Sequence, residues 1–226
     1  QPDNIGLFNF ANTYAGYFAL VAALGIPTYG VREVAKRRDD KKALGEISSQ
    51  LFSINVYTTI IVSILYVISL LIIGQLSLHV IFFLIAGFVI YTSPFSIEWY
   101  YQGLENFGFV TLRTIVVRLI SIVGLFIFVR DSGDVINYLL LNVFGSVISK
   151  VWNYIVLVRS GMRLHLVRTG LKQHLKPVTV LFASSIAISI YTVLDTLMLG
   201  FITTYSEVAY YNQATHISKM LVSIVT

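Results

Sequence analysis

The sequence contains no cysteine, and this absence excludes several kinds of chemistry at once. Without thiols the chain forms no disulfide, ligates no metal through cysteine and uses no cysteine nucleophile. Other signatures of catalysis are missing as well, because no HExxH, GxSxG or P-loop pattern occurs in the 226 residues. The sequence therefore offers no standard enzyme motif and no metal site.

Charged residues are also scarce. They make up 12% of the chain, against roughly 25% in a typical soluble domain. Hydrophobic residues reach 56% and the mean hydropathy is +0.78, which is more apolar surface than a soluble core would bury. The pI of about 9.4 would suggest nucleic acid as a partner of a soluble protein. In a membrane protein, the excess of Lys and Arg is explained by the orientation of the chain in the membrane and by attraction to anionic lipid headgroups. We therefore expect membrane lipids and no nucleic acid as partners.

Long apolar stretches recur along the chain. A hydrocarbon core about 30 Å thick requires about 20 apolar residues in a helix, and the sequence can be cut at that length seven times. The predicted spans are residues 8–29, 51–74, 80–97, 109–129, 135–158, 178–202 and 208 onward. The pattern therefore predicts an all-α polytopic membrane protein with about seven transmembrane helices.

Lys and Arg are concentrated in two of the gaps between these spans. Six lie within residues 31–50 and five within residues 159–177, whereas the three loops expected on the other side contain one. Cytoplasmic loops retain Lys and Arg, so both basic segments are predicted to face the cytoplasm.

The two ends of the chain carry a further pattern. The first residue is not Met and the last span stops at Thr226 without a polar flank, so we expect a piece of a longer protein. Residues 3–11 (DNIGLFNFA) match residues 206–214 (SEVAYYNQA) in residue type at an offset of 203 residues. An even number of spans separates the copies, which predicts parallel repeats related by an axis along the membrane normal.

Four segments resemble a known family. They are GLFNFA (6–11), LGIPTYGVREVA (24–35), EWYYQGLE (98–105), and LDTLMLG (194–200) followed by EVAYY (207–211). In combination they resemble the polysaccharide repeat-unit flippases of the Wzx type. The same superfamily also includes multidrug extruders and lipid II flippases.

The resemblance implies about 12 to 14 helices in two six-helix lobes around a central cavity. Residues 1–177 would form the N-terminal lobe without its first helix, and residues 178–226 would begin a truncated C-terminal lobe. The implied function is the flipping of polyprenyl-diphosphate-linked oligosaccharides, such as O-antigen units of lipopolysaccharide, by alternating access across the bacterial cytoplasmic (inner) membrane. Polysaccharide polymerase machinery would be a further partner.

An amphipathic linker is expected between the lobes, at about residues 161–177. Within it Leu164, Val167, Leu171 and Leu175 recur at helical spacing between basic residues. This spacing predicts a helix on the inner membrane surface.

Charged groups inside the spans are the candidate substrate contacts, because a charge at mid-helix costs roughly 2.5–3.5 kcal/mol on insertion scales. Arg118 is about 14 Å into its span at 1.5 Å per residue, and is either a substrate contact or the structural partner of a carboxylate. Arg113 is shallower and can reach the headgroups. Lys150 and Lys219 are deep enough to require a wet cavity. Four cations against Asp195 favour an anionic cargo such as a diphosphate.

Other polar residues have two interpretations each. Asp195 is a candidate for H⁺ or Na⁺ coupling, or the partner of a cation, and no other cofactor is expected. Asn212 and His216 are four residues apart and are candidates for cavity lining, although a lone helical His is more often a packing residue. Glu98 either gates the cavity with a nearby Arg or belongs to a solvated face. Pro94 is expected to bend its span.

Alternative functions fit the same topology. An exporter of drugs, cations or another lipid precursor remains within the superfamily. Asp131 and Asp134 form the one carboxylate pair in an outer loop, and such a pair could support a polyprenyl-sugar glycosyltransferase. This alternative is less favoured, because Asp-Ser-Gly-Asp between two helices is typical of a tight turn. A channel or an assembly scaffold is a third class that the sequence leaves open, and the midplane charges argue against a purely structural role. We therefore predict a protein that is not an enzyme.

Overall fold

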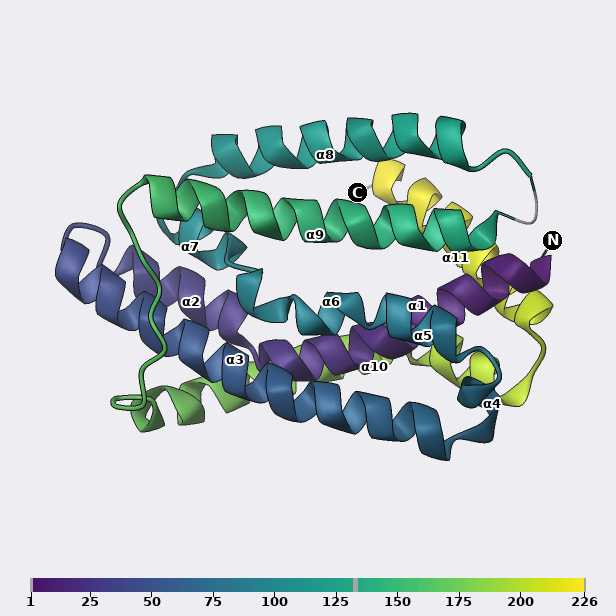
Figure 1. The fold of residues 1–226 in the computed structure, drawn as a ribbon, viewed down its shortest axis with the longest axis horizontal. Helices are drawn as coiled ribbons and strands as arrows, with labels where there is room; N and C mark the ends of the chain where they lie inside the picture. Colours follow the sequence, from purple (N-terminus) through teal and green to yellow (C-terminus); the bar gives the residue numbers. More distant parts are fainter. Residues whose placement is uncertain (1, 132–133, 226) are drawn as a thin grey trace.

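The computed structural model describes residues 2–131 and 134–225, without the side chains of residues 2, 192, 193 and 222–225 (Figure 1). All regular structure in these residues is helical. The elements are α1 (Pro2–Ala23), α2 (Ile26–Ala35), α3 (Lys41–Ile72), α4 (Gly74–Ser77), α5 (Val80–Ala86), α6 (Phe88–Tyr91), the 3₁₀ turn η1 (Ser93–Phe95), α7 (Glu98–Gly103), α8 (Phe107–Phe128), α9 (Val135–Arg159), α10 (Lys172–Ile202) and α11 (Tyr205–Val225).

Six helical segments of the described chain are long and apolar enough to cross a membrane. They are Asp3–Ala35, Lys41–Ile72, Val80–Gly103, Phe107–Phe128, Val135–Arg159 and Lys172–Tyr191. Their outer faces expose large apolar side chains, such as Ile64 and Leu71 of α3, which suits contact with lipid. The predicted all-α polytopic membrane fold is therefore confirmed. The seventh predicted span coincides with α11, which begins with a polar stretch and is not among the six.

Helix α1 lies at the centre of the bundle and packs against α3, α10 and α11, while α8 and α9 pair along one long edge (Figure 1). One buried cluster includes Phe10, Tyr66 and Phe83 and joins α1, α3 and α5. A second includes Leu51 and Trp99 and joins α3 to α2 and α7. The bundle therefore has two apolar cores, and the α8–α9 pair covers one side.

A turn at Leu24 and Gly25 divides the first span into α1 and α2. Both residues have positive φ, 47° and 72°, which interrupts the helix. A Cβ at Gly25 would lie 2.7 Å from the backbone nitrogen of Phe182, so glycine is required both for the conformation and for the approach of α10.

The third span is broken rather than continuous. The predicted bend at Pro94 is confirmed, because Pro94 lies in η1 between α6 and α7. Proline lacks an N–H, so a break of this kind leaves carbonyl groups free inside the membrane. Lys150 of α9 donates to this segment, at the carbonyl oxygen of Val89 (3.1 Å) and at Thr92 Oγ1 (2.8 Å).

The two basic segments meet at one end of the bundle. The linker between α9 and α10 lies along α3, where the His165 and Val167 N–H groups donate to the hydroxyls of Ser49 (3.3 Å) and Ser53 (2.9 Å). Residues 160–171 are not helical, so the expected amphipathic helix is wrong in its first part and α10 begins only at Lys172. The serine hydroxyls of α3 accept hydrogen bonds from linker N–H groups that would bond to backbone carbonyls if the linker were helical. We call this end, with residues 31–50 and 159–177, the basic end.

The two copies of the repeated pattern touch at the other end. Helices α1 and α11 both begin there, and the hydroxyl of Ser206 donates to Asp3 Oδ1 at 2.6 Å. These two residues occupy the same position in the repeated pattern. A Cβ at Gly6 would lie 1.6 Å from the carbonyl oxygen of Tyr205, so only glycine allows this approach of α11 to α1.

Candidate functional site

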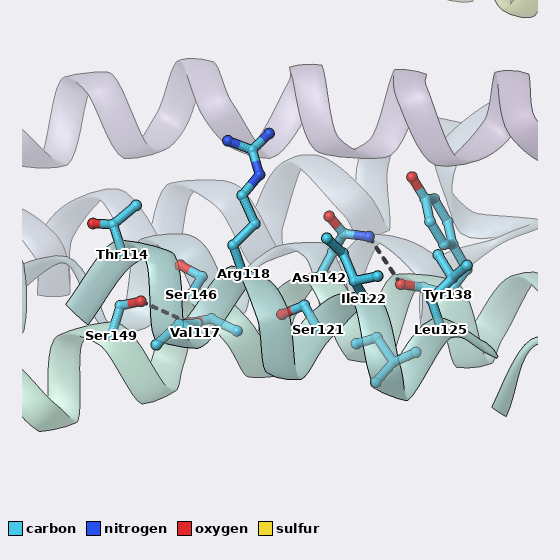
Figure 2. Close-up of a pocket in the computed structure, with 12 residues that line it drawn as sticks. Thr114, Val117, Arg118, Ser121, Ile122, Leu125, Tyr138, Asn142, Ser146 and Ser149 are labelled. Atoms are coloured by element: carbon cyan, nitrogen blue, oxygen red, sulfur yellow. Dashed lines mark hydrogen bonds between the residues drawn. The ribbon is translucent and has the colours of Figure 1, made fainter. Parts of the chain in front are cut away.

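A polar groove of about 470 Å³ runs between α8 and α9 (Figure 2). Each helix contributes one face at spacings of three and four residues, which is the repeat of a helical stripe. The lining residues are Thr114, Val117, Arg118, Ser121, Ile122 and Leu125 of α8, and Tyr138, Leu141, Asn142, Gly145, Ser146 and Ser149 of α9.

The polar residues of α8 near its middle share one face of the helix, together with Val117, Ile122 and Leu125. Ser121 follows Arg118 by three residues and joins it in the groove, whereas Ile115, Leu119 and Phe126 are exposed on other faces. Hydroxyl and amide groups at this depth are costly in lipid unless they are hydrogen-bonded or face water. Thr114, Asn142 and Ser149 each donate to a carbonyl oxygen of their own helix and keep acceptor atoms in the groove. The stripe therefore indicates a face that meets water or a polar ligand.

Arg118 lies at the middle of α8. It follows the first residue of the helix by eleven positions, about 16 Å at 1.5 Å per residue. Figure 2 shows its side chain extending away from the ribbon of α8, beyond the row of smaller groove residues. Within the described part of the chain its guanidinium has no hydrogen bond or ion pair. The carboxylate partner that would make Arg118 structural is therefore absent from the described residues.

A second pocket of about 460 Å³ adjoins the groove. It shares the lining residues Leu125 and Tyr138 with the groove, so the two are neighbours; we call the second the outer pocket and the two together the recess. Its other lining residues come from α1, from the α8–α9 connection and from α11: Asn4, Ile5, Phe8, Asn9, Val129, Asp131, Asp134, Val135, Gln213 and His216.

Asp134 stabilises the turn at the outer pocket. The backbone N–H groups of Arg130 and Asp131 donate to its Oδ2 at 3.0 and 3.1 Å, and they hold the pKa of the carboxyl below its usual value. These two bonds commit one oxygen of Asp134 to the backbone of Arg130 and Asp131. Ser132 and Gly133, between the two aspartates, lie outside the described residues.

Arg113 is a buried cross-link. Its side chain is 3% exposed, and its Nη2 atom lies 2.7 Å from Oε1 of Glu98 on α7. The same guanidinium donates to Thr114 Oγ1 at 3.1 Å and to the carbonyl oxygen of Ser149 on α9 at 3.4 Å. Arg113 therefore joins three helices at the end of the groove nearer the basic end, and Glu98 has the nearby arginine that the gate hypothesis required.

Lys150 lies outside the lining of the groove. Its Nζ donates to the carbonyl oxygen of Val89 at 3.1 Å and to Thr92 Oγ1 at 2.8 Å, at the C-terminal part of the broken span. Lys150 therefore contacts the broken span just before Pro94 rather than the groove.

The remaining sequence candidates lie on α10 and α11. The hydroxyl of Tyr211 donates to Asp195 Oδ2 at 2.6 Å, and that of Thr196 to Asn212 Oδ1 at 3.3 Å, so these residues link the two helices. His216 lines the outer pocket. Lys219, three residues further along α11, is exposed and has no ion pair within the described residues.

Sequence reasoning missed the uncharged members of the site. Ser121, Asn142, Ser146 and Tyr138 carry no charge, and a single hydroxyl or amide in a span is common. The available signal was their recurrence every three or four residues on two consecutive spans, which marks two polar stripes that face each other.

These features define a class: a multi-pass helical membrane protein with a polar recess and an arginine at its mid-depth. The predicted resemblance to polysaccharide repeat-unit flippases is confirmed by comparison with known proteins. All of residues 1–226 match the family described as "Polysaccharide biosynthesis protein", and the chain belongs to this family.

Two curated relatives each carry the name "Putative O-antigen transporter". The one from Escherichia coli (strain K12) is 24% identical over 231 residues, which cover 97% of this chain and 54% of the relative. The one from Shigella dysenteriae is 30% identical over 135 residues, which cover 58% of this chain and 34% of the relative. The chain thus spans about half the length of the first relative. Both names describe transporters rather than enzymes, and no solved structure matches the chain.

Proposed function

We propose that this chain is part of a flippase that carries a polyprenyl-diphosphate-linked oligosaccharide across the bacterial cytoplasmic membrane by alternating access. The observation that carries the proposal is Arg118, a cation at mid-depth in a polar groove with no acidic partner among the described residues. Arginine binds phosphate through two parallel charge-assisted hydrogen bonds.

The recess offers different chemistry at its two ends, and this suits an amphiphilic cargo. Arg118 would contact the diphosphate, with Ser121 and Asn142 as further hydrogen-bonding groups. The outer pocket would hold sugar residues, because amide groups such as those of Asn9 and Gln213 donate and accept hydrogen bonds with hydroxyls. The ring of Tyr138 lies where the groove and the outer pocket meet and would stack on a sugar face.

Contacts at the outer pocket support alternating access. Helices α1 and α11 touch where both begin, through Asp3, Ser206 and the close approach at Gly6. In the conformation described here, α1 and α11 would close the recess at the end opposite the basic end. Cargo would then leave by separation of α1 from α11, a rigid-body rocking of one helix group against another.

The distribution of acidic partners favours an anionic cargo over a cationic one. A cation exporter needs a free carboxylate beside its cargo. Asp195 already accepts from Tyr211 and Asp134 from the backbone, and the residues that line the groove around Arg118 include no carboxylate, so Asp131 is confined to the outer pocket. Asp131 and His216 remain at the outer pocket, where they would take part in H⁺ or Na⁺ coupling.

The test is translocation of a fluorescent polyprenyl-diphosphate saccharide by the full-length protein in proteoliposomes. Arg118→Ala should lower the rate about ten- to a hundredfold, because it removes charge-assisted hydrogen bonds of about 1.5–3 kcal/mol. Arg118→Lys should retain part of the activity, since the charge survives without the bidentate geometry.

Arg130→Ala is the matched control, because Arg130 follows the same helix and does not line either pocket. It should leave the rate within about twofold of the parent, as expected for a surface change. Equal rates for the Arg118→Ala and Arg130→Ala proteins, at equal incorporation, would overturn the assignment of Arg118.

A further inference from the structure

The ion pair at the inner end of the groove joins two side chains of very different exposure. The side chain of Arg113 is 3% exposed, whereas that of Glu98 is 46% exposed. Thr114 and Ser149, which also bond to Arg113, line the groove. The carboxylate can therefore move away into water, while the guanidinium stays buried between α7, α8 and α9 and then needs another acceptor.

Asn153 of α9 is a buried amide without a partner at this junction. Its side chain is 0% exposed, and within the described residues neither its Oδ1 nor its Nδ2 forms a hydrogen bond. Such cases are rare, because a buried polar group that lacks a partner costs free energy. The Nε atom of Arg113 is a buried donor that lacks a partner in the same part of the chain. One junction thus contains an unpaired acceptor and an unpaired donor.

Two contacts place Asn153 beside Arg113. The Nη1 atom of Arg113 donates to the carbonyl oxygen of Ser149 at 3.4 Å, and in an α-helix that oxygen also accepts from the N–H of Asn153, four positions later. The hydroxyl of Tyr101 on α7 donates to the carbonyl oxygen of Asn153. The guanidinium and the amide therefore lie against the same turn of α9, and α7 contacts both, through Glu98 and Tyr101.

From these observations we propose that Asn153 is a positioning residue, the alternative partner of Arg113 in a conformation in which Glu98 has moved away. In the arrangement described here, Arg113 pairs with Glu98, and α7 closes the groove at the end nearer the basic end. In the second arrangement, the Nε–H of Arg113 donates to Oδ1 of Asn153, α7 is released from α8, and the groove opens toward the basic end. This inference rests on the proposed function for its purpose, which is the entry of cargo from that side.

The experiment measures how fast an impermeant thiol reagent labels Ser121→Cys, a cysteine in the groove, in inside-out vesicles that contain the full-length protein. Residues 1–226 contain no other cysteine, and any further one is replaced by serine. Adding Asn153→Leu should lower the labelling rate by about tenfold or more, because it removes a hydrogen bond to a charged donor from the open arrangement. Asn153→Asp should raise the rate, since a second carboxylate competes with Glu98 for Arg113. Glu98→Gln should raise it as well, because it removes the charge that holds the closed arrangement.

Thermal unfolding separates this role from a role in packing. Asn153→Leu removes two unpaired buried polar atoms, so the melting temperature should stay the same or rise while the labelling rate falls. Ser48→Ala is the matched control. Ser48 is 0% exposed, its Oγ is likewise unpaired within the described residues, and it lines neither the groove nor the outer pocket. It should leave the labelling rate within about twofold of the parent.

Two results would overturn the exchange of partners. One is equal labelling of the parent and Asn153→Leu, and the other is a fall in Asn153→Asp as large as that in Asn153→Leu. Because labelling needs no cargo, it also separates this proposal from the proposed function. The expected order of labelling rates supports the exchange even if the parent fails to translocate the polyprenyl-diphosphate saccharide, a failure that would refute the function alone. If the parent translocates it and Asn153→Leu does so at the same rate, the exchange has no part in transport and the inference fails.

Discussion

The ion pair between Arg113 and Glu98 allows a quantitative test of how the groove is held together. Replacing Glu98 by Gln removes the partner of a guanidinium that is 3% exposed. Removal of one partner of a fully buried pair costs about 3–5 kcal/mol, whereas a solvent-exposed pair contributes about 0–1 kcal/mol. Glu98 is 46% exposed, so we expect an intermediate loss of about 2 kcal/mol for Glu98→Gln.

The double variant Glu98→Gln/Arg113→Met should recover most of this loss. It removes the buried charge together with its partner, and an apolar replacement of a buried pair is often neutral. Thr114, which accepts a hydrogen bond from Arg113 in the parent, keeps a hydrogen bond in the double variant, because its Oγ1 also donates to the carbonyl oxygen of Val110 at 2.7 Å. The coupling energy from the full cycle should therefore be about 2 kcal/mol.

The assay is reversible unfolding in mixed micelles, followed by tryptophan fluorescence. The chain has two tryptophans, and Trp99 is adjacent to Glu98, so the signal reports on α7. Glu105→Gln is the matched control, because it breaks the Arg38–Glu105 pair, in which both side chains are largely exposed at 46% and 67%. If Glu98→Gln costs no more than Glu105→Gln, or if the two single changes simply add in the double variant, the buried pair does not stabilise the α7–α8 junction.

Two further predictions concern topology and architecture. Single cysteines at Lys41 and Lys172 should resist an impermeant thiol reagent in intact cells while one at Asp131 reacts, because the charge pattern places the basic end in the cytoplasm; labelling at Lys41 from outside would reverse the orientation. In a structure of the full-length protein, α1 and α11 should superpose as equivalent members of two lobes, because residues 3–11 and 206–214 carry the same pattern at the start of each helix. A superposition that inverts the membrane normal would refute the parallel repeat.

Hydropathy and charge predicted the helices well but not where they begin or break. Residues 51–74 were predicted as a span from their apolar run, whereas α3 already begins at Lys41, since Asp40 caps its first turn. The linker has a helical apolar spacing, yet its backbone bonds to Ser49 and Ser53. Such partners come from a distant segment, and a local pattern does not contain them.

Depth along the helix identified the charged residues but not their partners. Arg118 was predicted as a substrate contact from its position alone, and the structure places it in a polar groove. Arg113 is five residues away, about 140° around the same helix, and this rotation turns it toward α7 and Glu98. The bond of Lys150 to Val89 depends on the break near Pro94, so its role followed from a tertiary feature.

The structure changes which cations are available to an anionic cargo. Four were counted from the sequence, but Glu98 neutralises Arg113, and Lys150 donates to a carbonyl and a hydroxyl. Arg118 on α8 and Lys219 on α11 then remain without an acidic partner among the described residues. Lys219 lines neither the groove nor the outer pocket, whereas Arg118 lines the groove. Among the four cations, Arg118 is therefore the one that the structure places where a diphosphate could meet it, and a cargo that binds there would favour the conformation in which the groove accepts it, since a ligand shifts an equilibrium toward the state it binds better.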